Sequence, residues 1–186
     1  MVKKNACIFI SGKGSNLKNL IKKTRDYNFP IKVCLVVSNN KKAKGILFAK
    51  KFSIPYISLN TNRYKFEKIV FQKVIEKRID IICLAGFMKI LSKKFVRNFK
   101  GKIINIHPSL LPKYKGLNTF QRVLKFKEKF TGCTVHYVDE KLDSGKIIVK
   151  RKIPINDKDN TSTLKKKVQL EEYKAYSNAI RKIFQI

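Results

Sequence analysis

The segment Ala6-Cys7-Ile8-Phe9-Ile10-Ser11-Gly12-Lys13-Gly14-Ser15-Asn16 decides how this chain begins to fold. Its five leading apolar residues, Ala6 to Ile10, predict a buried strand, and the two glycines after them predict a tight turn. Leucine and isoleucine then recur with the spacing of one helix face, which predicts a helix over about residues 17–25. A strand, a turn and a helix in this order open a βαβ unit.

The rest of the chain continues this alternation. Residues 31–37 form a continuous apolar run, typical of a buried parallel strand. Further strands are predicted at residues 56–59, 81–84, 102–106, 131–138 and 146–153, and helices at 43–52, 64–77, 93–99, 120–126 and 161–183. The last two strands are separated by too few residues for a helical crossover, so they form a hairpin-like pair or lie on different parts of the sheet. We expect an α/β fold, with a mostly parallel twisted sheet and helices on both faces, in a single domain over residues 1–186.

The composition is strongly basic, with a formal net charge of +31 from 43 basic and 12 acidic residues. Such a balance normally indicates nucleic acid or an anionic membrane as a partner. Only seven of the basic residues are arginine, and the lysines are scattered along the chain. Readers of nucleic acid tend to concentrate arginine and aromatic residues on one face. We therefore interpret the charge as compositional bias that still favours small anionic substrates.

The apolar runs and the cysteines of the sequence bear on the protein's location and on whether it binds a metal. It has no run of about 20 apolar residues, and its first apolar segment ends in a turn, so we expect neither a membrane span nor a signal peptide. The four cysteines, Cys7, Cys34, Cys83 and Cys133, lie in separate strand-like runs. They indicate buried thiols rather than disulfides or a metal site. We expect a cytoplasmic protein without a metal.

The stretch Asn105-Ile106-His107-Pro108-Ser109-Leu110-Leu111-Pro112 carries the clearest chemistry. Residues two apart on a strand point the same way, so Asn105 and His107 can aim an amide and an imidazole at one point. Asp143, arriving from elsewhere, could set the charge of that imidazole. This combination stabilises an oxyanion and moves protons, as acyl transfer requires. The alternative is a hydrogen-bonded turn, and the second histidine, His136, is interpreted as structural.

Three other segments are candidate binding sites. Gly12-Lys13-Gly14-Ser15-Asn16 opens a helix, where free N–H groups bind phosphate or carboxylate, although an ordinary tight turn fits equally well. The segment Leu84 to Leu91 lies at the carboxyl end of a buried strand, where α/β proteins bind ligands, although its apolar residues also suit a core. The third segment, Gln169 to Glu172 on the last predicted helix, is interpreted as a charged helix face.

Together these segments resemble the phosphoribosylglycinamide formyltransferases, within the folate-dependent formyltransferase family. The matching stretches occur in the family's order over nearly the whole chain. They are Ile10-Ser11-Gly12, Gly14-Ser15-Asn16-Leu17, Leu84-Ala85-Gly86-Phe87-Met88, Asn105 to Tyr114, Gly116-Leu117, and Leu142-Asp143 with Gly145.

The resemblance implies a Rossmann-like formyltransferase fold. It also implies transfer of a formyl group from 10-formyltetrahydrofolate, the co-substrate, to the amine of 5'-phosphoribosylglycinamide in purine biosynthesis, without a metal. By position, Asn105, His107 and Asp143 match the catalytic trio. The ribonucleotide site matches Gly14, Ser15, Asn16, Gln169, Leu170, Glu171 and Glu172, with Glu172 at the ribose. The folate site matches Arg63, Met88, Lys89, Ile90, Leu91, Asn105, Asp139, Glu140, Lys141, Leu142 and Asp143.

The chain departs from the family's pattern at a few positions. Lys13 stands where the family usually has Asn, and Lys89 where it often has Arg. Asn118 and Phe120 occupy positions where His is common. These changes bear on substrate affinity more than on catalysis.

Two alternative functions remain on sequence alone. One is a formyltransferase acting on another amine such as methionyl-tRNA, which the charge would suit, although that family carries an additional C-terminal domain for which we expect no room here. The other is a basic RNA-binding protein on an inactive scaffold, which leaves Asn105, His107 and Asp143 unexplained.

Overall fold

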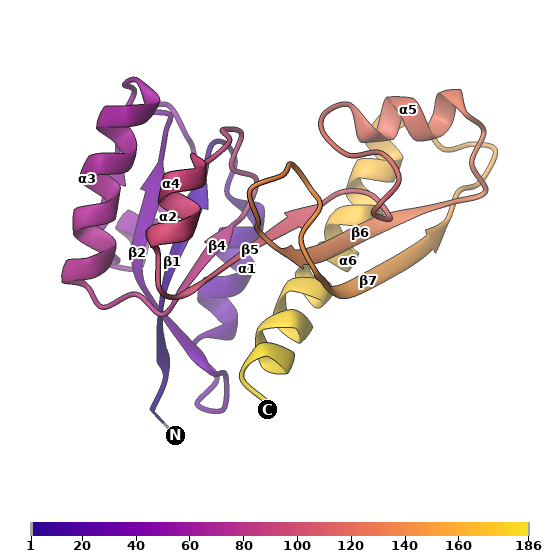
Figure 1. Cartoon of the computed structure of the whole chain (residues 1–186). Helices are drawn as coiled ribbons and strands as arrows, with labels where there is room; N and C mark the ends of the chain where they lie inside the picture. Colours follow the sequence, from indigo (N-terminus) through magenta and orange to yellow (C-terminus); the bar gives the residue numbers. More distant parts are fainter. Residues whose placement is uncertain (1, 186) are drawn as a thin grey trace. The chain divides into compact units, whose positions relative to one another are not determined.

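The structure is a computed structural model that describes residues 2–185, and these group into two compact units, residues 2–104 and 105–185 (Figure 1). The first unit contains β1 (Lys4–Ile10), α1 (Ser15–Lys23), β2 (Ile31–Ser38), α2 (Ile46–Lys51), β3 (Tyr56–Ser58), α3 (Arg63–Glu76), β4 (Ile81–Leu84), α4 (Lys93–Asn98) and the start of β5 (Lys102–His107). The second contains the end of β5, α5 (Thr119–Lys125), β6 (Phe130–Tyr137), β7 (Ile147–Pro154) and α6 (Thr161–Ile183).

The strands of the first unit follow the order β3-β2-β1-β4-β5. β1 pairs in parallel with both β2 and β4, and β2 pairs in parallel with β3. Each parallel connection passes through a helix, as βαβ topology requires. The predicted α/β fold with a mostly parallel sheet is therefore confirmed, and the strand boundaries lie within two residues of those predicted.

Alternation along β1 divides the first unit's core into two faces. Phe9 packs edge-on against Phe66 of α3 and Phe95 of α4, with ring centroids 6.4 Å apart in both pairs. Lys18 of α1 lies over the ring of Phe48 in α2, and Arg25, just after α1, lies over the ring of Phe52, just after α2. Because successive side chains on a strand point to opposite faces, one strand can serve both helix layers.

Glycine 45 explains why α2 is shorter than the predicted helix over residues 43–52. Its N–H donates to the carbonyl of Gly12 at 2.9 Å, which fastens the turn after β1 to the start of α2. A Cβ added at Gly14 would lie 2.6 Å from the Cα of Gly45, so the two backbones are in direct contact. The residues before Ile46 are thus used for this contact and the helix begins later.

The second unit is built on the strand order β5-β6-β7. β6 and β7 pair antiparallel, with Phe130 opposite Pro154, so the hairpin-like alternative is the correct one. The long helix α6 packs on both strands and buries Tyr176 and Ile180 completely. Asn160 begins this helix with a capping box, its side chain accepting from the N–H of Thr163 at 3.0 Å.

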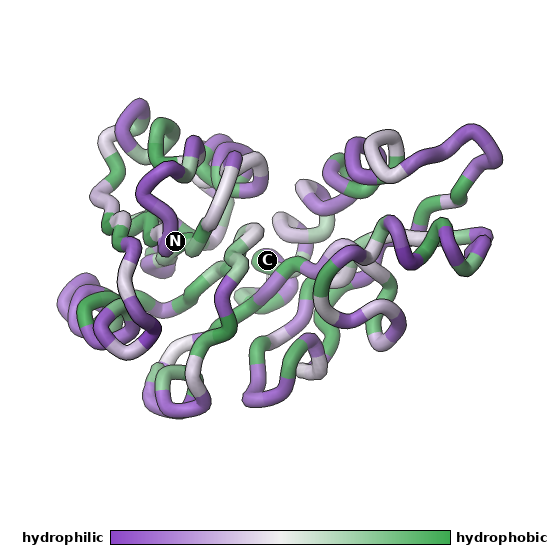
Figure 2. Tube along the Cα trace, turned by 90° about the horizontal axis from the view of Figure 1, so that it is seen from above, coloured by the Kyte–Doolittle hydropathy of each residue, from purple (hydrophilic) through white to green (hydrophobic). Residues whose placement is uncertain are grey.

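Apolar residues of the strands form most of the buried core, and Figure 2 shows how hydropathy varies along the chain. Cys7, Cys83 and Cys133 are buried as predicted, and burial raises the pKa of the Cys133 thiol to about 12. Cys34 is only half-buried, because strand β2 turns a less covered face outward at that position. Within residues 2–185, none of the helices is both long and apolar enough to cross a lipid bilayer.

The contact between Gly14 and Gly45 makes a stability prediction. Gly14→Ala should lower the free energy of unfolding by about 1–3 kcal/mol, because alanine would sit at a φ of 71° and its Cβ would meet the Cα of Gly45. Gly12→Ala is the matched control, since a Cβ there meets no atom within 4 Å. Urea denaturation of both variants measures the difference, and equal stability would contradict the close-contact explanation.

Candidate active site

His107 ends β5 and is followed by Pro108, which keeps the residue before it extended. Its side chain is buried, and its Nδ1 lies 3.3 Å from the carboxylate Oδ2 of Asp143. On the other side of the ring, Nε2 donates to the carbonyl of Tyr114 at 2.8 Å. Both partners are acceptors, so only the doubly protonated ring can donate to both. Both ring nitrogens thus face hydrogen-bond acceptors.

Asp143 reaches this position through unusual backbone geometry. Its φ is 47°, a left-handed conformation that aspartate tolerates better than most residues. The N–H of Gly116 donates to Oδ2 at 2.9 Å, while Oδ1 lies 3.7 Å from Nε2 of His136. The side chain is only 6% exposed. A carboxylate buried this far needs donors and a positive partner, and Gly116 and His107 supply them.

His136 lies beside the same cluster, and its buried, hydrogen-bonded ring agrees with the sequence interpretation as a structural histidine. It is 2% exposed, and burial lowers its pKa, so the ring is neutral near pH 7. Nδ1 donates to the carbonyl of Tyr137 at 2.7 Å, which leaves the Nε2 lone pair to accept from the Asn105 amide at 3.3 Å. Thr134 and His136 are two residues apart on β6 and so share a face of the strand, and in the structure Thr134 bonds to the loop after His107.

The loop after His107 is fastened to β6. The Thr134 hydroxyl donates to the carbonyl of Ser109 at 2.7 Å and accepts from the N–H of Leu111 at 3.1 Å. The Ser109 hydroxyl donates to the carbonyl of Lys113 at 2.8 Å and lies 3.3 Å from that of Tyr114. These bonds fix the Tyr114 carbonyl that faces His107.

The cluster as a whole can stabilise negative charge and carry a proton. Asn105 is partly exposed, and its amide nitrogen has a second hydrogen beyond the one directed at His136. His107 supplies a ring N–H in the same cluster. Donors of this kind, aimed at a developing oxyanion, stabilise it by about 3–4 kcal/mol each. The predicted trio of Asn105, His107 and Asp143 thus lies together within the second unit, with Asn105 joined to the other two through His136.

The other candidate residues of the second unit lie in the β6–β7 connection and on α6. In the connection, Asp139 accepts from the N–H of Lys141 and the hydroxyl of Ser144, both at 2.9 Å, and Leu142 is 52% exposed. On α6, the carboxylate of Glu171 pairs with Arg151 of β7 and with Lys174, both at 2.7 Å, and these cations lower its pKa. Glu171 thus ties α6 to β7.

The remaining candidates of the ribonucleotide and folate sites lie in the first unit. Gly14, with φ 71°, caps α1, and Ser15 and Asn16 form its first turn, where no acidic residue opposes an anion. Arg63 is exposed at the start of α3. In the β4–α4 loop, Met88, Lys89 and Ile90 are exposed, Leu91 is buried, and the N–H of Met88 donates to the Ser11 hydroxyl at 2.8 Å.

Two of the residues that depart from the family's pattern, Asn118 and Phe120, lie at the start of α5. Asn118 caps α5 with φ 57°, a conformation that asparagine adopts readily. Phe120 follows in the first turn of α5 and is half-buried. Across the described residues, no three or more His, Cys, Asp or Glu side chains gather in an arrangement that could hold a metal ion.

Comparison with known proteins connects this geometry to a family. The family described as formyl transferase matches residues 4–180. A phosphoribosylglycinamide formyltransferase of Haemophilus influenzae is 38% identical over 182 residues, covering 96% of this chain and 86% of that protein. The trifunctional purine biosynthetic protein adenosine-3 of Homo sapiens is 40% identical over 183 residues, covering 96% of this chain. The chain spans only 18% of that longer relative.

Solved structures agree with the sequence matches. The crystal structure of phosphoribosylglycinamide formyltransferase from Anaplasma phagocytophilum superposes with a TM-score of 0.93 at 37% identity, covering 99% of this chain and 88% of that one.

The burial of His136 makes a pH prediction. Because its pKa is lowered from the ordinary 6.5, the folded protein binds fewer protons than the unfolded chain, and acid should reduce stability as pH falls below about 6.5. His136→Gln should flatten this dependence between about pH 7 and pH 5. Urea denaturation across that range measures it, with the two proteins compared above pH 7 as the control. Equal pH dependence in both would contradict the assignment.

Proposed function

Because this chain belongs to the formyl transferase family, we propose that it transfers the formyl group of 10-formyltetrahydrofolate to the amine of 5'-phosphoribosylglycinamide. The observation that carries the proposal is the buried cluster of Asn105, His107, Asp143 and His136. A carboxylate between two histidines, with an amide at its edge, is suited to formyl transfer.

The reaction has a simple balance of bonds and protons. The substrate amine attacks the formyl carbon, a new C–N bond forms, and the carbonyl electrons move to the formyl oxygen. Collapse of this intermediate breaks the bond to the folate nitrogen N10. The proton lost by the attacking amine ends on N10. No step requires an oxidant or reductant.

Each residue of the cluster has a distinct role in this sequence. The second amide hydrogen of Asn105 and the Nε2–H of His107 stabilise the oxyanion. To do so, Nε2–H turns away from the Tyr114 carbonyl, its partner in this structure. Asp143 keeps the ring charged, and His107 then relays the proton directly or through a water. His136, held neutral, orients the Asn105 amide.

Substrate contacts are assigned by the chemistry of each segment. We place the ribonucleotide phosphate at Gly14, Ser15 and Asn16, because the first N–H groups of α1 and its dipole attract anions. Gln169, Leu170 and Glu172 of α6 contact the ribonucleotide, with Glu172 at the ribose, while Glu171 supports them through Arg151.

The folate is assigned to two segments and one arginine. The exposed residues Met88, Lys89 and Ile90 offer it an apolar surface with one cation. Asp139 to Asp143 bind it from the β6–β7 connection, and Arg63 offers a second cation. We also propose that the chain acts as a single domain in the cytoplasm.

A different acceptor is the main competing function. The charge of +31 would suit methionyl-tRNA or another RNA. The match to phosphoribosylglycinamide formyltransferases over 86% of the Haemophilus influenzae protein favours the small substrate. We confine the proposal to this one reaction, since the human trifunctional relative extends far beyond the matched segment.

Loss of the charged pair should stop the reaction. His107→Ala and Asp143→Asn should each lower kcat by about 100-fold or more, because one removes an oxyanion donor and proton carrier and the other its counter-charge. The loss of formyl folate, followed with purified protein and both substrates, measures this. Lys125→Gln, on the exposed surface of α5, is the control and should keep normal turnover. Near-normal activity of His107→Ala would overturn the assignment.

Any RNA binding should be weak and electrostatic. Affinity should fall steeply with salt and differ little between sequences, because phosphate neutralisation alone drives it. Filter binding of initiator tRNA and of an unrelated RNA across a salt series measures this. Tight binding of one RNA at physiological salt would favour the tRNA-directed alternative instead.

A further inference from the structure

The turn of residues 114–118 meets the catalytic cluster at two points. The carbonyl of Tyr114 accepts from Nε2 of His107 at 2.8 Å, and the N–H of Gly116 donates to Oδ2 of Asp143 at 2.9 Å. The backbone is left-handed at Tyr114, with a φ of 57°, and at Gly116, with a φ of 78°. A left-handed tyrosine is strained and persists only where its surroundings hold it in place. Groups outside the turn therefore decide where these two contacts point.

Arg122, on α5, binds the middle of this turn. Its Nη1 donates to the carbonyl of Lys115 at 2.6 Å and lies 3.5 Å from the carbonyl oxygen of Leu117. The guanidinium also lies over the ring of Tyr114, 5.2 Å from its centre. A planar guanidinium with several N–H donors can contact a carbonyl and an aromatic face together, which the ammonium of lysine does less well. One side chain thus contacts both the backbone and the ring of the turn.

A single peptide group connects Arg122 to Asp143. The carbonyl that accepts from Arg122 and the N–H that donates to Asp143 belong to the same peptide, between Lys115 and Gly116. Because a trans peptide is planar, with its carbonyl and N–H on opposite sides, fixing the carbonyl also fixes the direction of the N–H. A cationic donor at the oxygen polarises the peptide and strengthens its N–H as a donor. The oxygen that receives this N–H, Oδ2, is the one that lies 3.3 Å from Nδ1 of His107.

We propose that Arg122 is a positioning residue for the reaction. It holds the peptide between Lys115 and Gly116 so that the N–H stays directed at Asp143, and Asp143 in turn stays directed at His107. Arg122 lies outside the segments assigned to the two substrates, so it acts through this peptide and not on the reacting atoms. The inference rests on the proposed formyl transfer, because a role for Asp143 and His107 in that reaction is its premise.

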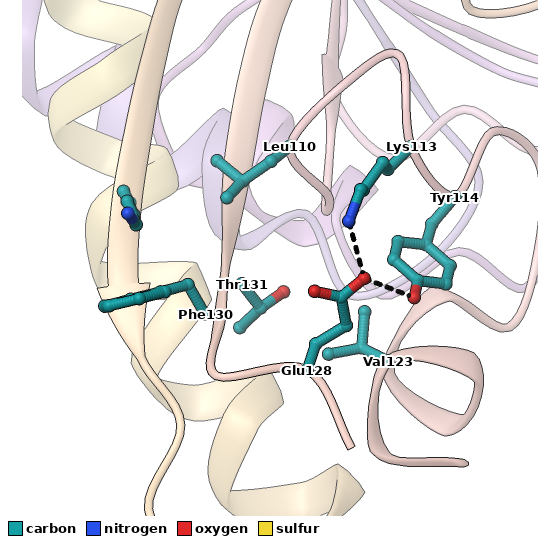
Figure 3. Close-up of a pocket in the computed structure, with 8 residues that line it drawn as sticks. Leu110, Lys113, Tyr114, Val123, Glu128, Phe130 and Thr131 are labelled. Carbon is teal, nitrogen blue, oxygen red and sulfur yellow. Dashed lines mark hydrogen bonds and ion pairs between the residues drawn. The ribbon is translucent and has the colours of Figure 1, made fainter. Parts of the chain in front are cut away.

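Glu128 contacts the same turn in a different way and supplies a matched control. Figure 3 shows the side chains of Lys113 and Tyr114 directed at Glu128, and both donate to its Oε1 at 2.8 Å. These bonds hold side chains, whereas Arg122 holds the peptide itself. Loss of the Glu128 carboxylate should therefore free the Tyr114 hydroxyl and leave the N–H of Gly116 in place.

Steady-state kinetics with purified protein and both substrates test the positioning role. Arg122→Met keeps a long side chain over the Tyr114 ring but removes its charge and its donors. We expect kcat to fall about tenfold, because a misdirected Asp143 orients His107 less well. KM for each substrate should stay within about twofold, since the lost contact is not to substrate. Arg122→Lys, which keeps one cationic donor, should recover most of the lost kcat, and Glu128→Ala should keep kcat within about twofold of the parent.

The amide proton of Gly116 gives a second readout that does not depend on turnover. A proton donated to a carboxylate resonates downfield, so in the ¹⁵N-labelled full chain the Gly116 resonance should move upfield in Arg122→Met and stay in place in Glu128→Ala. Thermal melting of each variant confirms that the fold is kept.

The two readouts separate failure of this inference from failure of the proposed function. The inference is overturned if the parent protein transfers formyl and Arg122→Met matches its kcat, if Glu128→Ala lowers kcat as much as Arg122→Met, or if the Gly116 resonance does not move. A parent protein that transfers no formyl group overturns the proposed function and, with it, the premise that Arg122 serves that reaction.

Discussion

The buried carboxylate of Asp143 is the constraint on which the catalytic region depends. A charge with a side chain only 6% exposed is stable only where donors and cations converge on it. Gly116 supplies a backbone N–H, and His107 supplies a charged ring. Their positions require the left-handed backbone at Asp143, an energetic cost that functional sites commonly carry and that the surrounding structure offsets.

The two histidines show how surroundings divide roles between identical side chains. His107 lies between a carbonyl and a carboxylate, so both ring nitrogens face acceptors. His136 lies between a carbonyl acceptor and the amide donor of Asn105, and burial keeps it neutral. In the proposed mechanism one ring donates to the oxyanion while the other orients the amide of Asn105. Environments that separate the protonation states of neighbouring groups are a general mark of acid–base sites.

The sequence predicted the strands and the helices, because these depend on local pattern, whereas the catalytic roles of Asn105, His107 and Asp143 stay predictions. Period-two alternation placed Asn105 and His107 on one side of β5, and apolar runs marked the parallel strands. It did not predict the place of His136, since a mid-strand histidine reveals neither its tautomer nor its partners until tertiary contacts form. The late start of α2 and the exposure of Cys34 were also unavailable to it, because each depends on contacts distant in sequence, and the antiparallel pairing of β6 with β7 was only one of two alternatives.

The bond between His107 and the Tyr114 carbonyl raises the question of how the ring is released for catalysis. Breaking a buried hydrogen bond is costly mainly when an acceptor is left unsatisfied. The Ser109 hydroxyl lies 3.3 Å from the same carbonyl, so that oxygen keeps a donor when the ring turns away. The turning ring meanwhile exchanges a neutral carbonyl for a developing oxyanion, a stronger acceptor. The resting contact therefore positions His107 without opposing its catalytic movement.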